Sequence, residues 1–172
     1  MRLFVAIRLN KEMRNTLTDI QNQLRRLGVR GNYTPPENLH LTLAFIGDHP
    51  ESDSVLEVLE GLRFEPVELR LRGLGSFGGL WWAGLEESGE LSSLVRQLRH
   101  ALAHAGIPFD RKNFLPHITL VRKPEYDHVP DFAHIKLPKA AMKAHRVSLM
   151  LSTRGKSGMI YSQLGHIEAE QA

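Results

Sequence analysis

The chain of 172 residues contains no cysteine. Disulfide bonds, thiolate nucleophiles and cysteine-based zinc sites are therefore excluded from its chemistry. Long apolar runs are missing as well, since no stretch approaches the roughly 18 residues that a membrane span needs. Residues 1–8 carry arginine at positions 2 and 8, so they indicate a first strand rather than a signal peptide. We therefore expect a cytoplasmic protein without a membrane partner.

A large excess of charge of one sign is also absent. The chain has 22 lysines and arginines against 19 acidic residues, a net charge of +3. Such a mildly basic chain is compatible with a nucleic-acid partner but does not identify one. The hydrophobic share of 42% is ordinary for a soluble globular protein. At this length we expect residues 1–172 to form a single domain, built of two small lobes.

Two short segments carry the chemistry. Residues 37–47 alternate with period two and end in glycine, as a β-strand does. On one face His40, Thr42 and Ala44 should lie together, about 7 Å apart in steps of two residues. The other face, which we expect in the core, carries Leu39, Leu41, Leu43 and Phe45.

The second segment, residues 116–122, repeats the order His, aliphatic, Thr, Leu. It places His117 and Thr119 on one strand face. A single histidine in a strand is most often structural, but two matched copies in strand-like segments indicate a shared, two-fold site.

Hydrophobic periodicity predicts the other elements. Helices are expected near residues 10–27, 52–62 and 88–105, and further strands near 2–9, 66–73, 80–85, 144–152 and 159–167. A strand–helix–strand unit near 1–47 recurs near 80–122, which indicates an internal duplication with the two histidines across one cleft. The strands are amphipathic, which favours antiparallel sheets.

Two histidines that face each other suit paired acid and base catalysis near neutral pH. The hydroxyls of Thr42 and Thr119 can donate hydrogen bonds to the non-bridging oxygens of a phosphoryl group. Arg122 is a candidate for binding charge on phosphorus. Strict alternation points it away from His117, so it needs a strand end or a bulge to reach the site.

A metal site is the chemical alternative. The two motif histidines are too few ligands, and a third would have to come from His49, His128 or a carboxylate. His100 and His104 are four apart on an expected helix, but the glutamate of a His-Glu-x-x-His site does not accompany them. We therefore expect neither a metal nor a cofactor.

The paired His-x-Thr motifs resemble those of the 2H phosphoesterases. Residues 2–7, 35–43 and 116–122 look like the corresponding segments of bacterial and archaeal RNA 2′,3′-cyclic phosphodiesterases, historically called 2′-5′ RNA ligases. One departure is Tyr33, where the family pattern leads us to expect tryptophan. The resemblance implies an α+β fold of two pseudo-symmetric lobes, with antiparallel sheets lining a central cleft and helices outside.

The resemblance also implies a reaction, the metal-independent hydrolysis of an RNA-terminal 2′,3′-cyclic phosphate to a 2′-phosphate. His117 would be the general base that activates water, and His40 the general acid that protonates the departing 3′ oxygen. The two roles can be exchanged, because the sequence does not orient the substrate. Thr42, Thr119 and Arg122 would bind the phosphate. The reverse reaction, 2′-5′ RNA ligation, would use the same groups.

The expected partner is RNA with a 2′,3′-cyclic phosphate end, or a related nucleotide, bound by a monomer. Two alternatives stay open: a non-catalytic module that binds RNA ends or nucleotides, and a phosphodiesterase for a small cyclic nucleotide. Basic residues in the expected loops could follow an RNA backbone, namely Arg111, Lys112, Lys123, Arg154 and Lys156.

Overall fold

The computed structural model describes residues 1–170, which form two antiparallel sheets and three α-helices. The strands are β1 (Arg2–Arg8), β2 (Arg30–Tyr33), β3 (His40–Asp48), β4 (Val67–Phe77), β5 (Leu80–Leu85), β6 (His117–Glu125), β7 (Ala141–Ala144), β8 (Arg146–Gly155) and β9 (Gly158–Glu168). The helices are α1 (Lys11–Arg26), α2 (Asp53–Glu60) and α3 (Gly89–His104), with short 3-10 helices η1 (Pro36–Asn38) and η2 (Phe132–His134).

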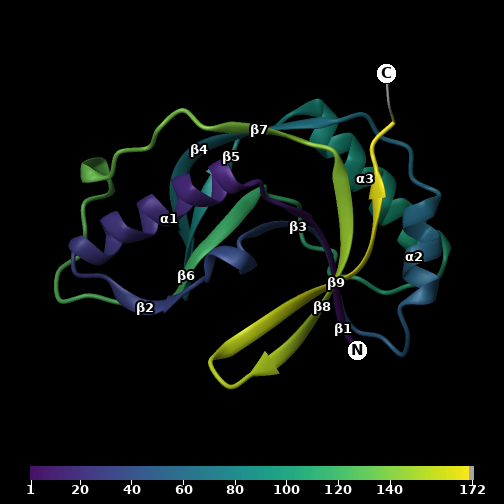
Figure 1. Ribbon diagram of the computed structural model, residues 1–172, viewed down its shortest axis with the longest axis horizontal. Coiled ribbons are helices and arrows are strands. Elements are labelled where there is room, and N and C mark those ends of the chain that lie inside the picture. The colour runs from purple at the N-terminus through teal and green to yellow at the C-terminus, as the bar shows by residue number, and fades with distance from the viewer. Residues whose placement is uncertain (171–172) are drawn as a thin grey trace.

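One sheet has four strands in the order β3-β1-β8-β9, and the other has five in the order β2-β6-β5-β4-β7. Figure 1 shows them as two lobes, with α1 in the lobe of the five-stranded sheet and α2 and α3 beside the four-stranded one. The α+β fold of two antiparallel lobes is therefore confirmed.

The two expected strand–helix–strand units are β1–α1–β3 and β5–α3–β6. In each unit the strands belong to one sheet, but the helix contacts the other: α1 contacts β6, and α3 contacts β3. Each unit thus crosses to the opposite lobe and returns, which holds the two motif strands in a fixed relation.

Local sequence explains why α1 forms where it does. The Asn10 side chain accepts a hydrogen bond of 2.8 Å from the Met13 amide and so caps the first turn. The buried positions of the helix recur at spacings of three and four, which keeps one face on the core. A single hydrophobic cluster joins this face to residues of both sheets.

A β-bulge interrupts the alternation of β3. Val5 of β1 pairs with Ala44, but the next residue, Ala6, pairs with Thr42, so Leu43 has no partner in β1. Leu43 and Ala44 are consequently both buried, and Phe45 turns toward the cleft. The expectation that Phe45 belongs to the core face and Ala44 to the cleft face was wrong, because alternation alone does not reveal the bulge.

The same bulge recurs in β6. Trp81 of β5 pairs with Val121, whereas Trp82 pairs with Thr119, so Leu120 has no partner in β5. Because of this bulge, the side chain of Arg122 lies on the cleft face, whereas strict alternation would place it on the opposite face.

Other differences from the expected elements are local. The first motif strand begins at His40 rather than residue 37, because Pro36–Asn38 form η1. Strand β4 continues through the glycine-rich residues 73–77, beyond the end expected near residue 73, and a Cβ at Gly75 would collide with the Trp82 indole. The short strands β2 and β7 were not expected, because they depend on their partners β6 and β4 for hydrogen bonds.

Candidate active site

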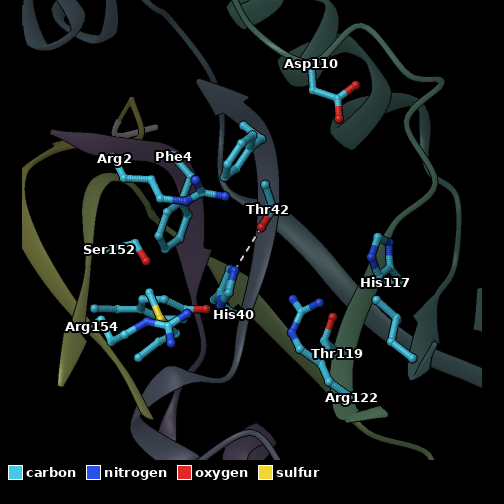
Figure 2. Close-up of a pocket in the computed structure, with 14 residues that line it drawn as sticks. Arg2, Phe4, His40, Thr42, Asp110, His117, Thr119, Arg122, Ser152 and Arg154 are labelled. Atoms are coloured by element: carbon cyan, nitrogen blue, oxygen red, sulfur yellow. Dashed lines mark hydrogen bonds between the residues drawn. The ribbon is translucent and has the colours of Figure 1, made fainter. Parts of the chain in front are cut away.

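A cavity of about 780 Å³ lies between the two motif strands. Figure 2 shows β3 presenting His40 and Thr42 from one side and β6 presenting His117 and Thr119 from the other. Arg122 also lines the cavity, so the structure brings all five predicted site residues together.

His40 is held in one orientation by two hydrogen bonds. Its Nδ1 lies 2.7 Å from the Asn38 carbonyl oxygen, and its Nε2 lies 2.8 Å from Thr42 Oγ1. A carbonyl only accepts, so this network assigns the proton of the neutral ring to Nδ1. The lone pair of neutral His40 is therefore on Nε2, where the Thr42 hydroxyl donates to it.

His117 is anchored in the same way. Its Nδ1 lies 2.7 Å from the Leu115 carbonyl oxygen, again two residues earlier in the chain, which leaves Nε2 for proton transfer. The ring edge packs against Phe77 with centroids 5.2 Å apart. Both histidines thus offer the same nitrogen to the cavity.

The two histidines differ in their surroundings. His40 is packed against Phe4 and Tyr161, with ring centroids 4.9 and 5.3 Å away. This burial is the largest effect and lowers the pKa of His40. The Asn38 hydrogen bond, the next largest effect, raises the pKa in part, and the positive charges of Arg122 and His117 lower it again. In the free protein His40 is therefore more readily neutral than an ordinary histidine, and a bound anion will favour its charged form.

Positive charge dominates the walls of the cavity. Figure 2 shows Arg2, Arg122 and Arg154 reaching it from β1, β6 and β8, against the single carboxylate of Asp110. Arg2 also lies over the Phe45 ring, 5.1 Å from its centroid. The site is electrostatically suited to a phosphate anion.

Sequence reasoning missed several cavity residues, namely Arg2, Phe4, Phe45, Ser152 and Tyr161. The alternation of β1 could have placed Arg2 and Phe4 on one face, but only the pairing of β1 with β3 sets that face beside His40. Of the basic residues expected in loops, Arg154 and Lys123 lie instead in β8 and β6. Arg154 lines this cavity and Lys112 a neighbouring one. Arg111, Lys123 and Lys156 line neither.

Among residues 1–170, no three His, Asp or Glu side chains are grouped so that they could hold a metal ion. In the same part of the chain, no helix has the length and apolar character required to cross a membrane.

Residues 7–156 match the sequence model of the 2′-5′ RNA ligase superfamily. The chain belongs to this family. A relative from Thermotoga maritima, named RNA 2′,3′-cyclic phosphodiesterase, is 31% identical over 185 residues, covering 99% of this chain and 96% of that protein. A Thermus thermophilus protein of the same name is 37% identical over 139 residues, covering 72% and 69%. The resemblance read from the two motifs is confirmed, and this superfamily member is an enzyme of the 2H phosphoesterase type.

Solved structures of the superfamily have the same fold. The Thermus thermophilus protein TT0787 superposes with a TM-score of 0.82 at 32% identity, covering 99% of this chain and 100% of that one. Escherichia coli LigT, crystallised with 3′-AMP, gives a TM-score of 0.82 at 26% identity, covering 99% and 98%.

Proposed function

We propose that the protein hydrolyses the 2′,3′-cyclic phosphate at an RNA end to a 2′-phosphate, by acid–base catalysis between two histidines and without a metal ion. The observation that carries the proposal is the matched anchoring of His40 and His117. Each ring donates Nδ1–H to a backbone carbonyl, so that Nε2 is the nitrogen left for acid–base chemistry; in His40 it also accepts from the Thr42 hydroxyl. Relatives that are named for this activity support it.

His117 is the general base in this proposal, and His40 the general acid. Nε2 of His117 takes a proton from water as its oxygen attacks phosphorus, and protonated Nε2 of His40 gives a proton to the departing 3′ oxygen. The lowered pKa of His40 does not forbid this role, because a bound phosphate anion stabilises the imidazolium. Thr42, Thr119 and Arg122 bind the non-bridging oxygens, where negative charge increases in the transition state.

A second cavity supports an RNA strand as the substrate, in preference to a cyclic mononucleotide. It measures about 610 Å³ and adjoins the first cavity, since both are lined by Arg122 and Tyr161. Asn38, whose carbonyl binds His40, also lines it. Arg25 lies there 4.0 Å above the centroid of the Tyr33 ring. An arginine on an aromatic ring offers charge for a phosphate and a flat surface for a base. The nucleotides before the RNA end can follow this path.

The same groups can join RNA ends through a 2′-5′ linkage, the reverse reaction in the family's historical name. Hydrolysis should dominate, because water is present at far higher concentration than any RNA hydroxyl. Since β3 and β6 of one chain supply the whole catalytic pair, we also expect a monomer to be active. Activity that follows only a dimer fraction upon dilution would contradict this.

The decisive experiment incubates an oligoribonucleotide ending in a 2′,3′-cyclic phosphate with the protein and EDTA, and maps the phosphate of the product. His40→Ala and His117→Ala should each lower kcat by about 10²–10⁴-fold, while the exposed His100→Ala on α3 should not. Retained turnover in either motif variant would contradict paired catalysis. Turnover of a cyclic mononucleotide but not of the oligoribonucleotide would show that the substrate is a small cyclic nucleotide. Tight binding of RNA without turnover would favour the binding module.

A further inference from the structure

A third cavity, of about 650 Å³, opens into the catalytic cavity from the side of His117. The two share Thr42, Phe45 and His117 in their linings. Its size falls within the roughly 300–1,000 Å³ of pockets that take small organic ligands. Neither His40 nor Tyr161 lines it, and it shares no lining residue with the cavity that we assign to the RNA strand.

The walls of this cavity are suited to a nucleobase. Phe77, which is 42% exposed, lies against both His117 and Trp82. Leu115, which is 40% exposed, adds aliphatic surface. Flat aromatic surface left open to solvent binds bases of any sequence by stacking. A patch of this kind beside a catalytic base indicates a ligand that comes to the reacting atoms.

The charged rim is suited to the backbone that follows such a base. Lys112, whose side chain is 89% exposed, lies at the rim with its Nζ 4.0 Å from the Asp110 carboxylate. Arg99 of α3 lies beside it and donates a hydrogen bond of 2.7 Å to the Lys112 carbonyl. Lys112 and Arg99 carry two positive charges and Asp110 one negative charge, so the rim has a net positive charge that can bind a phosphodiester.

The geometry of displacement at phosphorus decides which molecule binds there. The attacking and departing oxygens lie roughly in line on opposite sides of the phosphorus. With His40 protonating the departing 3′ oxygen, the attacking oxygen must come from the His117 side, where this cavity lies. Water uses that position in hydrolysis, and an RNA hydroxyl must use it in ligation.

We propose that this cavity, lined by Phe77, Leu115, Lys112 and Asn113, binds the first nucleoside of an RNA that ends in a free 5′-hydroxyl. This deepens the proposed function and rests on it. The 5′ oxygen forms a bond to phosphorus and the bond from phosphorus to the 3′ oxygen breaks. The hydroxyl proton passes to His117, and His40 returns one proton to the 3′ oxygen, so the reaction balances without a co-reactant.

The test measures how the protein divides its substrate between two products. An oligoribonucleotide with a 2′,3′-cyclic phosphate is incubated with an excess of a second oligonucleotide that ends in a 5′-hydroxyl, and the 2′-phosphate and the 2′-5′ joined product are quantified. An acceptor that carries a 5′-phosphate is the chemical control, since it has no attacking hydroxyl.

Asn113 is exposed at the cavity, so the Asn113→Trp side chain should occupy part of the space for an acceptor base and leave both histidines in place. The ratio of joined to hydrolysed product should fall at least about tenfold, because the loss of one base-stacking interaction weakens binding by about that factor. The kcat/KM of hydrolysis should stay within about twofold of the wild-type value. Asn15→Trp, the same change on the exposed face of α1, should leave both unchanged. An unchanged ratio in Asn113→Trp, or a parallel loss of hydrolysis, would overturn the proposal.

Lys112→Ala is a second variant that does not depend on how a tryptophan packs. It should raise the KM of an acceptor oligonucleotide but not that of a free nucleoside, which has no phosphate to bind. An equal KM for the oligonucleotide in wild type and variant contradicts the charged rim. A wild type that hydrolyses the donor but joins no acceptor refutes the acceptor cavity alone, whereas absence of hydrolysis refutes the proposed function itself.

Discussion

Phe45 and Arg122 occupy equivalent positions in the two motifs, each five residues after its histidine. Each side chain is turned into the cleft by a β-bulge two residues earlier, at Leu43 and at Leu120. The backbone of the site therefore obeys the pseudo-two-fold relation while its chemistry does not. One half presents an aromatic ring beneath Arg2, and the other presents a cation. The two histidines are nevertheless anchored alike, each through Nδ1 to a backbone carbonyl two residues earlier.

Arg122→Gln should lower kcat by about 10²–10³-fold, because Arg122 binds charge that increases in the transition state. Arg111→Gln is the matched control, an exposed arginine that does not line the cavity. Steady-state kinetics on the cyclic-phosphate oligonucleotide separates the parameters. A change confined to KM would show that Arg122 binds the ground state and the transition state equally well.

The pH dependence should reveal the acid. A general acid must be protonated, and the pKa of His40 lies below its ordinary value of 6.5. The fall of kcat/KM with rising pH should therefore begin at a lower pH than for an unperturbed histidine. The corresponding fall of kcat should lie at higher pH, since bound phosphate raises the pKa. If His40 is instead the base, activity will rise with pH through this pKa.

A change of leaving group should separate the two histidines. A substrate with sulfur in place of the 3′ oxygen departs as a thiolate and needs little help from an acid. His40→Ala should therefore recover most of its activity on this substrate, whereas His117→Ala should remain inactive. Recovery of activity in His117→Ala alone would show that His117 is the acid and His40 the base. Equal behaviour of the two variants on both substrates would speak against a division between acid and base.

Gln21 should stabilise the bulge that directs Arg122. Its side chain is 2% exposed, and Nε2 donates to the carbonyls of Thr34 at 2.9 Å and of Leu120 at 3.0 Å. The Leu120 carbonyl also accepts from the Thr34 amide at 3.0 Å. Gln21→Leu should cost about 1–3 kcal/mol of the free energy of unfolding, because the Thr34 carbonyl loses this donor and the Leu120 carbonyl loses one of its two.

Urea denaturation followed by circular dichroism measures that loss, with Asn15→Leu on the exposed face of the same helix as the control. We also expect a lower kcat in Gln21→Leu, through a less well-fixed Arg122. A stable Gln21→Leu protein with normal kcat would show that the pairing of β6 with β5 holds the bulge by itself.

The sequence by itself determined the helices, most strands and the pair of histidines that we propose to be catalytic. The three helices have apolar residues at spacings of three and four, and the side chains of Asn10 and Ser88 cap α1 and α3; both signals act within a few residues. His40 and His117 could be found because alternation needs only neighbouring positions, and because the motif occurs twice. Recognition of the family followed from the same residues.

Only the tertiary structure decided which side chains join that pair. The bulges at Leu43 and Leu120 depend on how β3 pairs with β1 and β6 with β5, and no local pattern records such a register. The pairing of β1 with β3, together with that of β8 and β9, likewise brings Phe4 and Tyr161 against His40 and lowers its pKa. Burial and charge at a site come from contacts between distant segments, so they appear only when the sheets are assembled.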